Sequence, residues 1–371
     1  MSLAFLVAFL LLLSNSATSM AAQSFNVLHT FTGGADGGSP VAGLIVDAQG
    51  NLYGSAGNVL FKFDRAGHET VLHTGVGSMG TLVLDNAGNI FGTTYQGGTF
   101  NRGTVFELDT NGTVTTLHNF GGGTDGAYPA AGLITDVTGE MYGTTSQGGR
   151  HGAGTIFKLD KFGVESVLHS FAGPDGSNPF AILIGDASGN LYGTTEFGGY
   201  SNQCAGTQQG CGVVFELHPT GRETVLYRFS GGADGSRPAA GLVRDENGNL
   251  YGTTIAGGAS GNGAVFKLDH AGAEMVLHSF TAVEGVEPSC QLVRDSRGNL
   301  YGTTLDGGPV DTGTLFKVDK ASVFTIIHNF DGTTDGYFLP AGLARDMHGH
   351  LFGITELGGG FGFGTVFEMT P

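Results

Sequence analysis

The sequence predicts an all-β fold, a seven-bladed β-propeller with four-stranded blades. The first observation is a repeat built on Leu-Tyr-Gly-Thr-Thr, whose aromatic position recurs at intervals of 38, 51, 50, 59, 50 and 51 residues. A period near 50 residues indicates one supersecondary unit copied around an array. The second observation is that the apolar runs are short, β-branched or aromatic, and bounded by Gly, Asp, Asn or Pro, as is typical of strands. The seven aromatic positions are Tyr53, Phe91, Tyr142, Tyr192, Tyr251, Tyr301 and Phe352.

One complete unit, residues 129–179, shows the four strands in order. The first runs up to Asp136, the second covers 140–145, the third covers 154–160 and the fourth covers 165–171. Tight turns containing Gly separate the first strand from the second and the third from the fourth. A long Gly-rich loop separates the second from the third. Seven such units describe a propeller.

The two ends of the repeat array predict how the ring closes. Residues 25–31 form a fourth-strand motif without a unit of its own, and the last unit ends after its third strand, 365–371. We expect the N-terminal strand to complete the last blade, which leaves no open sheet edge between first and last blades. The prediction is a single propeller domain over residues 22–371.

Residues 1–21 resemble a secretory signal peptide. An apolar run at 3–13 is too short to span a bilayer, and small Ser19 and Ala21 follow at the −3 and −1 places of a cleavage site. We therefore expect a secreted protein, extracellular or periplasmic, without membrane insertion and monomeric. The chain has 33 Asp and Glu against 16 Lys and Arg and no basic cluster, which argues against nucleic acid as a partner.

The three cysteines suggest one disulfide. Cys204 and Cys211 both lie in an insertion of the fourth unit, and export would permit them to form a bond. Two free thiols are the alternative. Cys290 takes the place of Ala131 at the head of a first strand, where a small buried residue fits, so packing is the expected role.

Most of the tempting polar residues recur in nearly every unit and are therefore interpreted as scaffold. The Asp that ends each first strand is followed three residues later by Gly, which is hairpin chemistry. A His in the fourth strand is expected to hydrogen-bond a neighbouring strand or turn. One acidic residue in each blade-to-blade link is expected to form an Asx turn, because one carboxylate per loop is too few ligands for calcium. We expect no metal and no cofactor. The His positions are His29, His73, His118, His169, His278 and His328, and the acidic link positions are Asp36, Asp125, Asp175, Asp234, Glu284 and Asp335.

The links between blades and the loops between second and third strands share one face of a propeller, here named the long-loop face. The opposite, tight-turn face carries only hairpin turns. The first unit is shortened on the long-loop face at 55–58 and 74–78, and the fourth is enlarged at 200–212. We expect the long-loop face to be the functional face, because function concentrates on loops held by a rigid scaffold. Short loops on blade one opposite a long loop on blade four would form a groove that suits an elongated ligand.

The unrepeated polar and aromatic side chains of the long-loop face are the candidate site residues. Glu196 and Glu356 occupy the same repeat position and could serve glycoside hydrolysis, but they lie three blades apart. A Tyr or His beside an Arg could abstract a proton next to a uronate carboxylate, as in a lyase. The catalytic candidates are Arg150, His151, Glu196 and Tyr200. The ligand-binding candidates are Tyr95, Arg102, Tyr128, Arg237, Tyr337 and Glu356. Asn101, Asp306 and Asp311 are further unrepeated polar residues.

The string Asn-Leu-Tyr-Gly-Thr-Thr-x-x-Gly-Gly, followed by Gly-x-Val-Phe-Lys-Leu-Asp and Val-Leu-His-x-Phe, resembles the GloVer tandem-repeat proteins over essentially the whole mature chain. The resemblance implies a bacterial, exported protein and supplies no catalytic residues. Members often end in surface anchors, whereas this chain stops on its last predicted strand, so we expect it to be released. The leading hypothesis is a propeller that binds an extracellular glycan. The alternatives are a polysaccharide-degrading enzyme, with a uronate lyase favoured over a hydrolase, and a structural or protein-interaction propeller.

Overall fold

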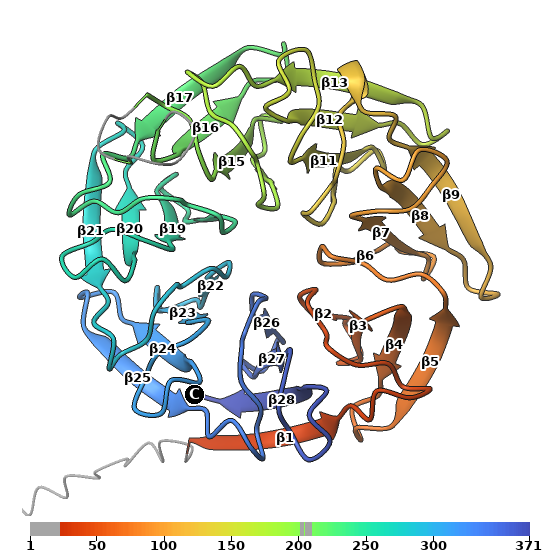
Figure 1. The fold of residues 1–371 in the computed structure, drawn as a ribbon, viewed down its shortest axis with the longest axis vertical. Coiled ribbons are helices and arrows are strands. Elements are labelled where there is room, and N and C mark those ends of the chain that lie inside the picture. The colour runs from red at the N-terminus through yellow and green to blue at the C-terminus, as the bar shows by residue number, and fades with distance from the viewer. Residues whose placement is uncertain (1–22, 201–203, 205–209) are drawn as a thin grey trace, which may run out of the picture.

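A computed structural model describes residues 23–200, 204 and 210–371. The predicted signal peptide and most of the fourth unit's insertion lie outside the described residues. The described chain forms seven four-stranded antiparallel sheets arranged as blades of a ring (Figure 1). This confirms the predicted fold. One short 3₁₀ helix, η1 (Gly123–Asp125), is the only helix in these ranges, and none there could span a membrane.

Each blade places one strand at each of four distances from the ring axis. The innermost strands are β2 (Ile45–Val46), β6 (Val83–Leu84), β10 (Ile134–Thr135), β14 (Ile184–Gly185), β18 (Val243–Arg244), β22 (Val293–Arg294) and β26 (Ala344–Arg345). The second strands are β3 (Leu52–Ala56), β7 (Ile90–Thr94), β11 (Met141–Thr145), β15 (Leu191–Thr195), β19 (Leu250–Thr254), β23 (Leu300–Thr303) and β27 (Leu351–Thr355). The third strands are β4 (Val59–Phe63), β8 (Thr104–Leu108), β12 (Thr155–Leu159), β16 (Val213–Leu217), β20 (Ala264–Leu268), β24 (Thr314–Val318) and β28 (Thr365–Thr370). The outermost strands are β5 (Glu69–Thr74), β9 (Val114–Asn119), β13 (Glu165–Ser170), β17 (Glu223–Arg228), β21 (Glu274–Ser279), β25 (Phe324–Asn329) and β1 (Ser24–Thr30).

The N-terminal strand completes the last blade, as predicted. The sheet order of that blade is β26-β27-β28-β1, and β1 pairs antiparallel with β28 from Ser24 opposite Thr370 to Thr30 opposite Thr365. In Figure 1 the red-orange β1 lies beside the dark blue β28. The chain then passes directly from β1 into the first blade, so this strand joins the two ends of the ring.

The repeated Gly of the second strand exists because of the repeated Phe of the third strand. Gly143 lies opposite Phe157 in the register of β11 and β12. A Cβ atom at Gly143 would lie 2.6 Å from the tip of the Phe157 ring and 2.9 Å from Leu133. Gly therefore leaves the space that the ring fills, and Phe157 is completely buried. The same relation holds in every blade, with nearest contacts of 2.4–2.7 Å.

The hydrophobic core lies between blades, with one cluster at each of the seven seams. At six seams a second repeated Phe, just after the outermost strand, packs against the third-strand Phe of the next blade. Phe120 and Phe157 illustrate the geometry, with ring centroids 5.1 Å apart in an edge-to-face arrangement. These ring pairs pack neighbouring blades against one another.

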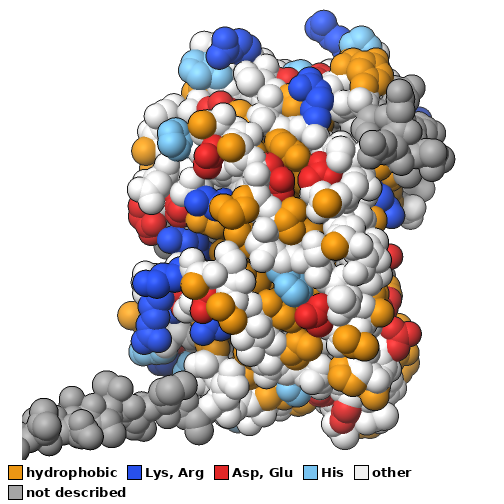
Figure 2. Space-filling view, turned by 90° about the vertical axis from the view of Figure 1, so that its left-hand side faces the viewer, with side chains coloured by type: hydrophobic (Ala, Val, Ile, Leu, Met, Phe, Trp, Pro, Cys, Tyr) orange, Lys and Arg blue, Asp and Glu red, His pale blue; other side chains and the backbone are white. Residues whose placement is uncertain are grey.

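The tight-turn face is built from the predicted Asp hairpins. Asp47 accepts hydrogen bonds from the backbone N–H of Gln49 and Asn51 and from the hydroxyl of Tyr53, so the repeated Asp and Tyr support one turn. Figure 2 shows the outer wall of the ring, where hydrophobic side chains are scattered among polar ones and Lys and Arg gather along one edge.

Candidate functional site

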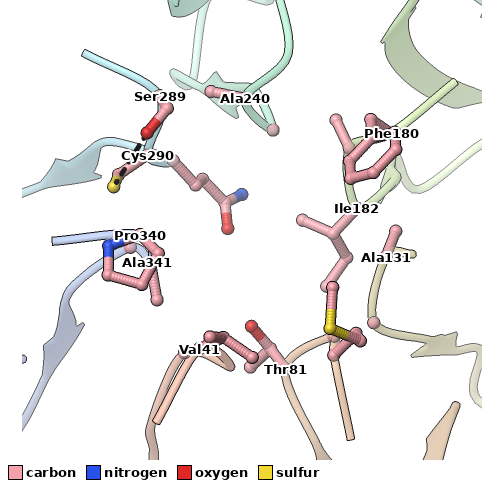
Figure 3. Close-up of a pocket in the computed structure, with 18 of the residues that line it drawn as sticks. Val41, Thr81, Ala131, Phe180, Ile182, Ala240, Ser289, Cys290, Pro340 and Ala341 are labelled. Atoms are coloured by element: carbon pink, nitrogen blue, oxygen red, sulfur yellow. Dashed lines mark hydrogen bonds between the residues drawn. The ribbon is translucent and has the colours of Figure 1, made fainter. Parts of the chain in front are cut away.

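A cavity of about 470 Å³ lies on the ring axis at the long-loop face. The segments that lead into the seven innermost strands line it, so every blade contributes to its wall (Figure 3). Its lining is mostly apolar, with Val41, Phe180, Ile182 and Pro340 among the larger side chains. Ligand pockets typically enclose about 300–1,000 Å³ and combine apolar walls with a few polar groups. The size and lining of this axial cavity place it in that class.

The floor of the axial cavity alternates small and large residues around the ring. The residue before the repeated Leu of the innermost segment is Gly in blades one, three, five and seven, and a larger residue in blades two, four and six. A Cβ at Gly43 would lie 2.7 Å from the hydroxyl of Thr81, and one at Gly241 would lie 2.8 Å from Ile182. The larger side chains therefore occupy the space that the neighbouring glycines leave. The larger residues are Thr81, Ile182 and Gln291.

Cys290 lines the axial cavity without being a reactive group. It is buried, its thiol donates a hydrogen bond to the carbonyl of Leu339 at 3.1 Å, and burial raises the thiol pKa to about 11. The thiolate is the nucleophilic form of Cys, so a raised pKa makes this thiol inert. This geometry fits the packing role expected from the sequence.

A ring of six unlike side chains, here called the left-handed ring, occupies one repeated backbone position in the links that lead to the axial cavity, although none of the six lines the cavity itself. In six blades the residue just before the innermost segment adopts a left-handed conformation, with φ between 50° and 61°. The backbone hydrogen bonds of these residues recur. At five of them the N–H donates to a loop carbonyl of the preceding blade, as Tyr128 does to Arg102, and at five the carbonyl accepts the N–H of a residue after the second strand, as Phe338 does from Glu356. Non-glycine residues in this conformation cost about 1–3 kcal/mol each and cluster at functional sites. The members of this left-handed ring are Ser39, Tyr128, Asn178, Arg237, Glu287 and Phe338.

Three side chains of the left-handed ring contact a residue that follows a second strand. Tyr128 and Arg237 contact that residue of the preceding blade, and Asn178 contacts that of its own blade. Tyr128 packs against Tyr95 with ring centroids 5.1 Å apart. Arg237 donates to Oε1 of Glu196 through Nε at 3.0 Å and Nη2 at 2.5 Å, and Nδ2 of Asn178 donates to Oε2 of the same Glu at 2.7 Å. Both oxygens of Glu196 are thus engaged, which leaves this carboxylate as a structural anion. The contacts bring together two pairs of sequence candidates across blade boundaries.

Glu356 occupies the repeat position of Glu196 but has a different environment. It is the only charged residue among those lining the axial cavity, and it forms no salt bridge within the described part of the chain. Burial raises the pKa of its carboxyl group. An ionisable group with a raised pKa in an apolar cavity is a candidate for hydrogen bonding to a ligand or for proton transfer.

The family model of the Gloeobacter/Verrucomicrobia repeat matches residues 55–207 and 200–371. The chain belongs to this repeat family. The resemblance drawn from the repeat motifs is therefore confirmed. No curated protein sequence matches the chain.

Solved structures similar to this repeat-family member show the fold. A streptogramin B lyase has a TM-score of 0.61 and 13% identity, covering 94% of this chain and 97% of its own. The virginiamycin B lyase of Staphylococcus aureus has a TM-score of 0.59 and 10% identity, covering 94% and 99%. A chain of the mitotic checkpoint complex has a TM-score of 0.57 and 12% identity, covering 99% of both. Enzymes and a protein-assembly component share this architecture, so the likeness carries no activity.

Two catalytic candidates of this repeat-family protein line a second cavity, on the outer edge of blade three. Arg150 and His151 enclose about 570 Å³ together with Asp125, Glu165 and His169. Burial, and then the negative charge of Asp125, raise the pKa of Glu165 to about 7. Arginine, histidine and a carboxyl group titrating near neutrality are the residue types that proton transfer requires. Glu196 and Tyr200 do not line this outer cavity.

The remaining candidates have local roles in their loops. Nη1 of Arg102 donates to the carbonyl of Gly121 at 2.9 Å. Tyr337 pairs through its backbone with Leu357, and Tyr200 is 66% exposed beside the residues outside the described ranges. Cys204 and Cys211 form a disulfide with Cα atoms 5.5 Å apart. Asn101 and Asp311 each accept a backbone hydrogen bond within their own loop, and burial raises the pKa of Asp306.

The sequence reasoning did not find the floor or most of the left-handed ring. The unrepeated loop residues singled out from the sequence do not include Ser39, Asn178, Glu287 and Phe338, although each stands at the same place before a repeated innermost segment. A signal was available at the floor, where Thr81, Ile182 and Gln291 interrupt a column of Gly in the aligned units. Departures from the repeat that shape the candidate site therefore lie in the short segments nearest the ring axis as well as in the long loops.

We predict that two seam carboxyls make the protein more stable in mild acid than at neutral pH. The pKa of Glu165 and of Glu274 is raised to about 7, first by burial and then by the charge of Asp125 and Asp234 respectively. Between the unfolded value near 4.5 and 7, the folded protein holds protons that the unfolded chain has released. The free energy of unfolding therefore falls as pH rises through this window, by about 1–2 kcal/mol per group.

Urea unfolding at a series of pH values would measure this slope. The variant carrying E165Q and E274Q should lose part of the decline between pH 4.5 and 7, because neither amide titrates. The matched control is E246Q, which replaces an exposed Glu on the tight-turn face. If the double variant and the wild type show parallel profiles, these two carboxyls do not govern the pH dependence.

Proposed function

We propose that the protein binds an extracellular glycan at the axial cavity of its long-loop face. The observation that carries the proposal is the cavity itself, which has apolar walls from all seven blades and one carboxyl group, Glu356, that forms no ion pair with any described residue. A sugar ring presents a C–H face that packs on apolar side chains and hydroxyl groups that need hydrogen-bond partners. The apolar floor and walls of the cavity would pack against the C–H face. Thr81, Gln291 and Glu356 would hydrogen-bond to the hydroxyl groups.

The left-handed ring supports a role in recognition over a role in architecture alone. One repeated backbone position carries six different side chains, namely hydroxyl, phenol, amide, guanidinium, carboxylate and phenyl, next to the segments that line the axial cavity. Packing alone would have no need of this diversity at one structural position. Rigid loops that present unlike side chains are how scaffold proteins bind ligands. The shortened loop of the first blade lets a long ligand leave the opening on that side.

Export remains part of the proposal. The apolar segment at 3–13 and the disulfide between Cys204 and Cys211 both fit a protein that acts in an oxidising compartment. The disulfide packs against the link into blade five, where a Cβ at Gly231 would lie 2.7 Å from the sulfur of Cys204. The disulfide therefore holds the insertion of blade four against the link into blade five on the long-loop face.

Glycan-array screening followed by calorimetry tests the proposal. We expect F180A and E356Q each to weaken binding of an array hit at least about tenfold, equivalent to about 1.4 kcal/mol. Phe180 supplies apolar wall and Glu356 supplies the carboxyl group. The matched control is F162A, which removes a 78% exposed ring from a hairpin on the tight-turn face. An array without signal above background, or equal affinity in all variants, would contradict glycan binding here.

A uronate lyase is the second candidate, favoured by the outer cavity on blade three. Arg150 could bind a uronate carboxylate, and His151 or Glu165 could take the proton beside it. The assay is the appearance of unsaturated product from a panel of uronate polysaccharides. Activity that H151A abolishes would establish this reading. No product from any substrate would remove it and leave the axial cavity as the functional site.

A further inference from the structure

We propose that the seam between blades seven and one binds a divalent transition-metal ion of the Zn²⁺ class. The ligands would be Nε2 of His29, on β1, a carboxylate oxygen of Asp36, in the link, and a carboxylate oxygen of Glu69, on β5. All three ligand atoms lie within 4.8 Å of one another. Imidazole and carboxylate together are ligands that suit Zn²⁺ and its neighbours in the first transition row.

The distances in this cluster fit an ion better than hydrogen bonds. Nε2 of His29 lies 3.4 Å from Asp36 and 3.8 Å from Glu69, both beyond the usual hydrogen-bond range of about 2.7–3.2 Å. Ligands of tetrahedral zinc, at about 2.0–2.1 Å from the metal, are roughly 3.3–3.4 Å apart. Nε2 of His29 and Oε1 of Glu69 are buried without a hydrogen-bond partner among the described residues. One cation would satisfy both.

The charges of the cluster also call for a cation. Two carboxyl groups and one imidazole meet here, and among the described residues no Lys or Arg forms an ion pair with Asp36 or Glu69. The carboxylate of Asp36 is held by the backbone N–H and the hydroxyl of Thr32, at 2.8 and 2.5 Å. Such outer contacts orient metal ligands.

Other seams of the ring provide an internal comparison. In the seams between blades five and six and between six and seven, Phe takes the place of Glu69. There Phe324 stacks on His278 at 3.8 Å, and Phe25 stacks on His328 at 3.7 Å. A seam can therefore close by ring stacking, and closure alone does not require a second buried carboxyl group. Glu165, Glu223 and Glu274 occupy the position of Glu69 in three other seams, so the seam between blades seven and one is distinguished by its geometry. There the His ring converges with both carboxyl groups without a hydrogen bond to either, an arrangement that a bound cation would use.

Two further seams repeat the full set of residue types. Between blades two and three, His118, Asp125 and Glu165 do not form a cluster within 4.8 Å, whereas between blades three and four His169, Asp175 and Glu223 do. There Nε2 of the His is only 2.9 Å from the Asp, so a hydrogen bond already occupies it. We expect the weaker metal affinity at this seam. The expectation of no metal rests on one carboxylate per link, whereas in the folded ring a His and the Glu of the next blade converge on that carboxylate.

The location gives the ion a structural effect. His29 lies on the N-terminal strand of blade seven and Glu69 on the outermost strand of blade one, so the ion would connect the two blades where the ring closes. A ligand that binds only the folded ring stabilises it by mass action. The metal would hold β1 of blade seven against blade one, and this effect does not depend on which ligand the axial cavity binds.

Zinc titration of the chelator-treated full chain against a competing chromogenic chelator tests the proposal, together with thermal unfolding with and without Zn²⁺. We expect one tight equivalent and an unfolding midpoint raised by several degrees. H29A and the nearly isosteric E69Q should each weaken that equivalent at least about tenfold and abolish the shift. H328A removes the same repeat position from a Phe seam and should retain both, as should the surface double variant H348A/H350A.

Three results would overturn the proposal. The first is no zinc binding by the wild-type chain. The second is an equivalent that E69Q retains in full while the fold is intact by circular dichroism. The third is an equivalent lost in E223Q or in H348A/H350A instead, which would assign the ion to the seam between blades three and four or to the tight-turn surface.

Discussion

Removal of β1 is expected to prevent the ring from closing. A chain beginning at residue 32 lacks the outermost strand of blade seven and leaves β28 with an unpaired edge. It also loses Phe31, which is completely buried in the cluster between blades seven and one, and Phe25, which stacks on His328. Truncating one fully buried Phe costs about 3–5 kcal/mol, and the strand adds its backbone pairing to that loss. This exceeds the effect of most single substitutions.

The comparison chain begins at residue 23 and retains β1. We expect it to unfold cooperatively in urea at the same midpoint as the full chain, whereas the chain beginning at residue 32 should aggregate or show no cooperative transition. A synthetic peptide of residues 23–31, added in trans, should partly restore the transition by pairing with β28. A cooperative transition of the shorter chain at an unchanged midpoint would show that closure by β1 contributes little.

The architecture was predictable because a propeller repeats its local chemistry in every blade. The Asp-to-Gly hairpins, the Tyr-Gly-Thr-Thr strand and the unpaired fourth-strand motif at 25–31 each carry a local physical meaning, and their recurrence determines the blade count. The repeat also allowed the recurring Asp and His to be interpreted as scaffold. That interpretation holds for Asp47 and its equivalents, whose side chains are used in their own turns.

The candidate site was predictable only in part, because it depends on contacts between blades. Tyr95 with Tyr128 and Glu196 with Arg237 were named singly, but their pairing across a seam follows from ring geometry that no local pattern contains. The same holds for the cluster of His29, whose ligands come from one blade, a link and the next blade. The repeat shows which residues occupy equivalent positions in different blades. It does not show which non-equivalent residues meet at the seam between two blades.

In the axial cavity, the sequence shows where a residue departs from the repeat but not what that departure does. Ile182 stands among glycines in the aligned units, yet its importance depends on how far it reaches over Gly241. A departure from a repeat can be located in the sequence. Its consequence depends on the distance to the neighbouring blade, which only the closed ring defines.

Adding one methyl group at Gly143 is expected to lower the free energy of unfolding by about 2–3 kcal/mol, and G143V should cost more. The new Cβ would lie 2.6 Å from the ring of Phe157, a side chain that Phe120 of the adjacent blade holds at 5.1 Å between centroids. The ring cannot retreat without disturbing the seam. Because Gly143 does not adopt a left-handed conformation, the cost measures close approach and not backbone strain. Urea unfolding provides the measurement.

The control is G185A, another strand glycine without positive φ, where the nearest atoms to a new Cβ are 3.9 Å away. It should change stability by less than about 0.5 kcal/mol. The decisive comparison replaces Phe157, whose ring faces Gly143, with the smaller Leu. F157L alone should destabilise, but in the G143A background the added methyl should cost much less, because the space it needs is then free. If the two changes are additive, the repeated Gly owes its place to something other than the repeated Phe, and the packing rule inferred for all seven blades fails.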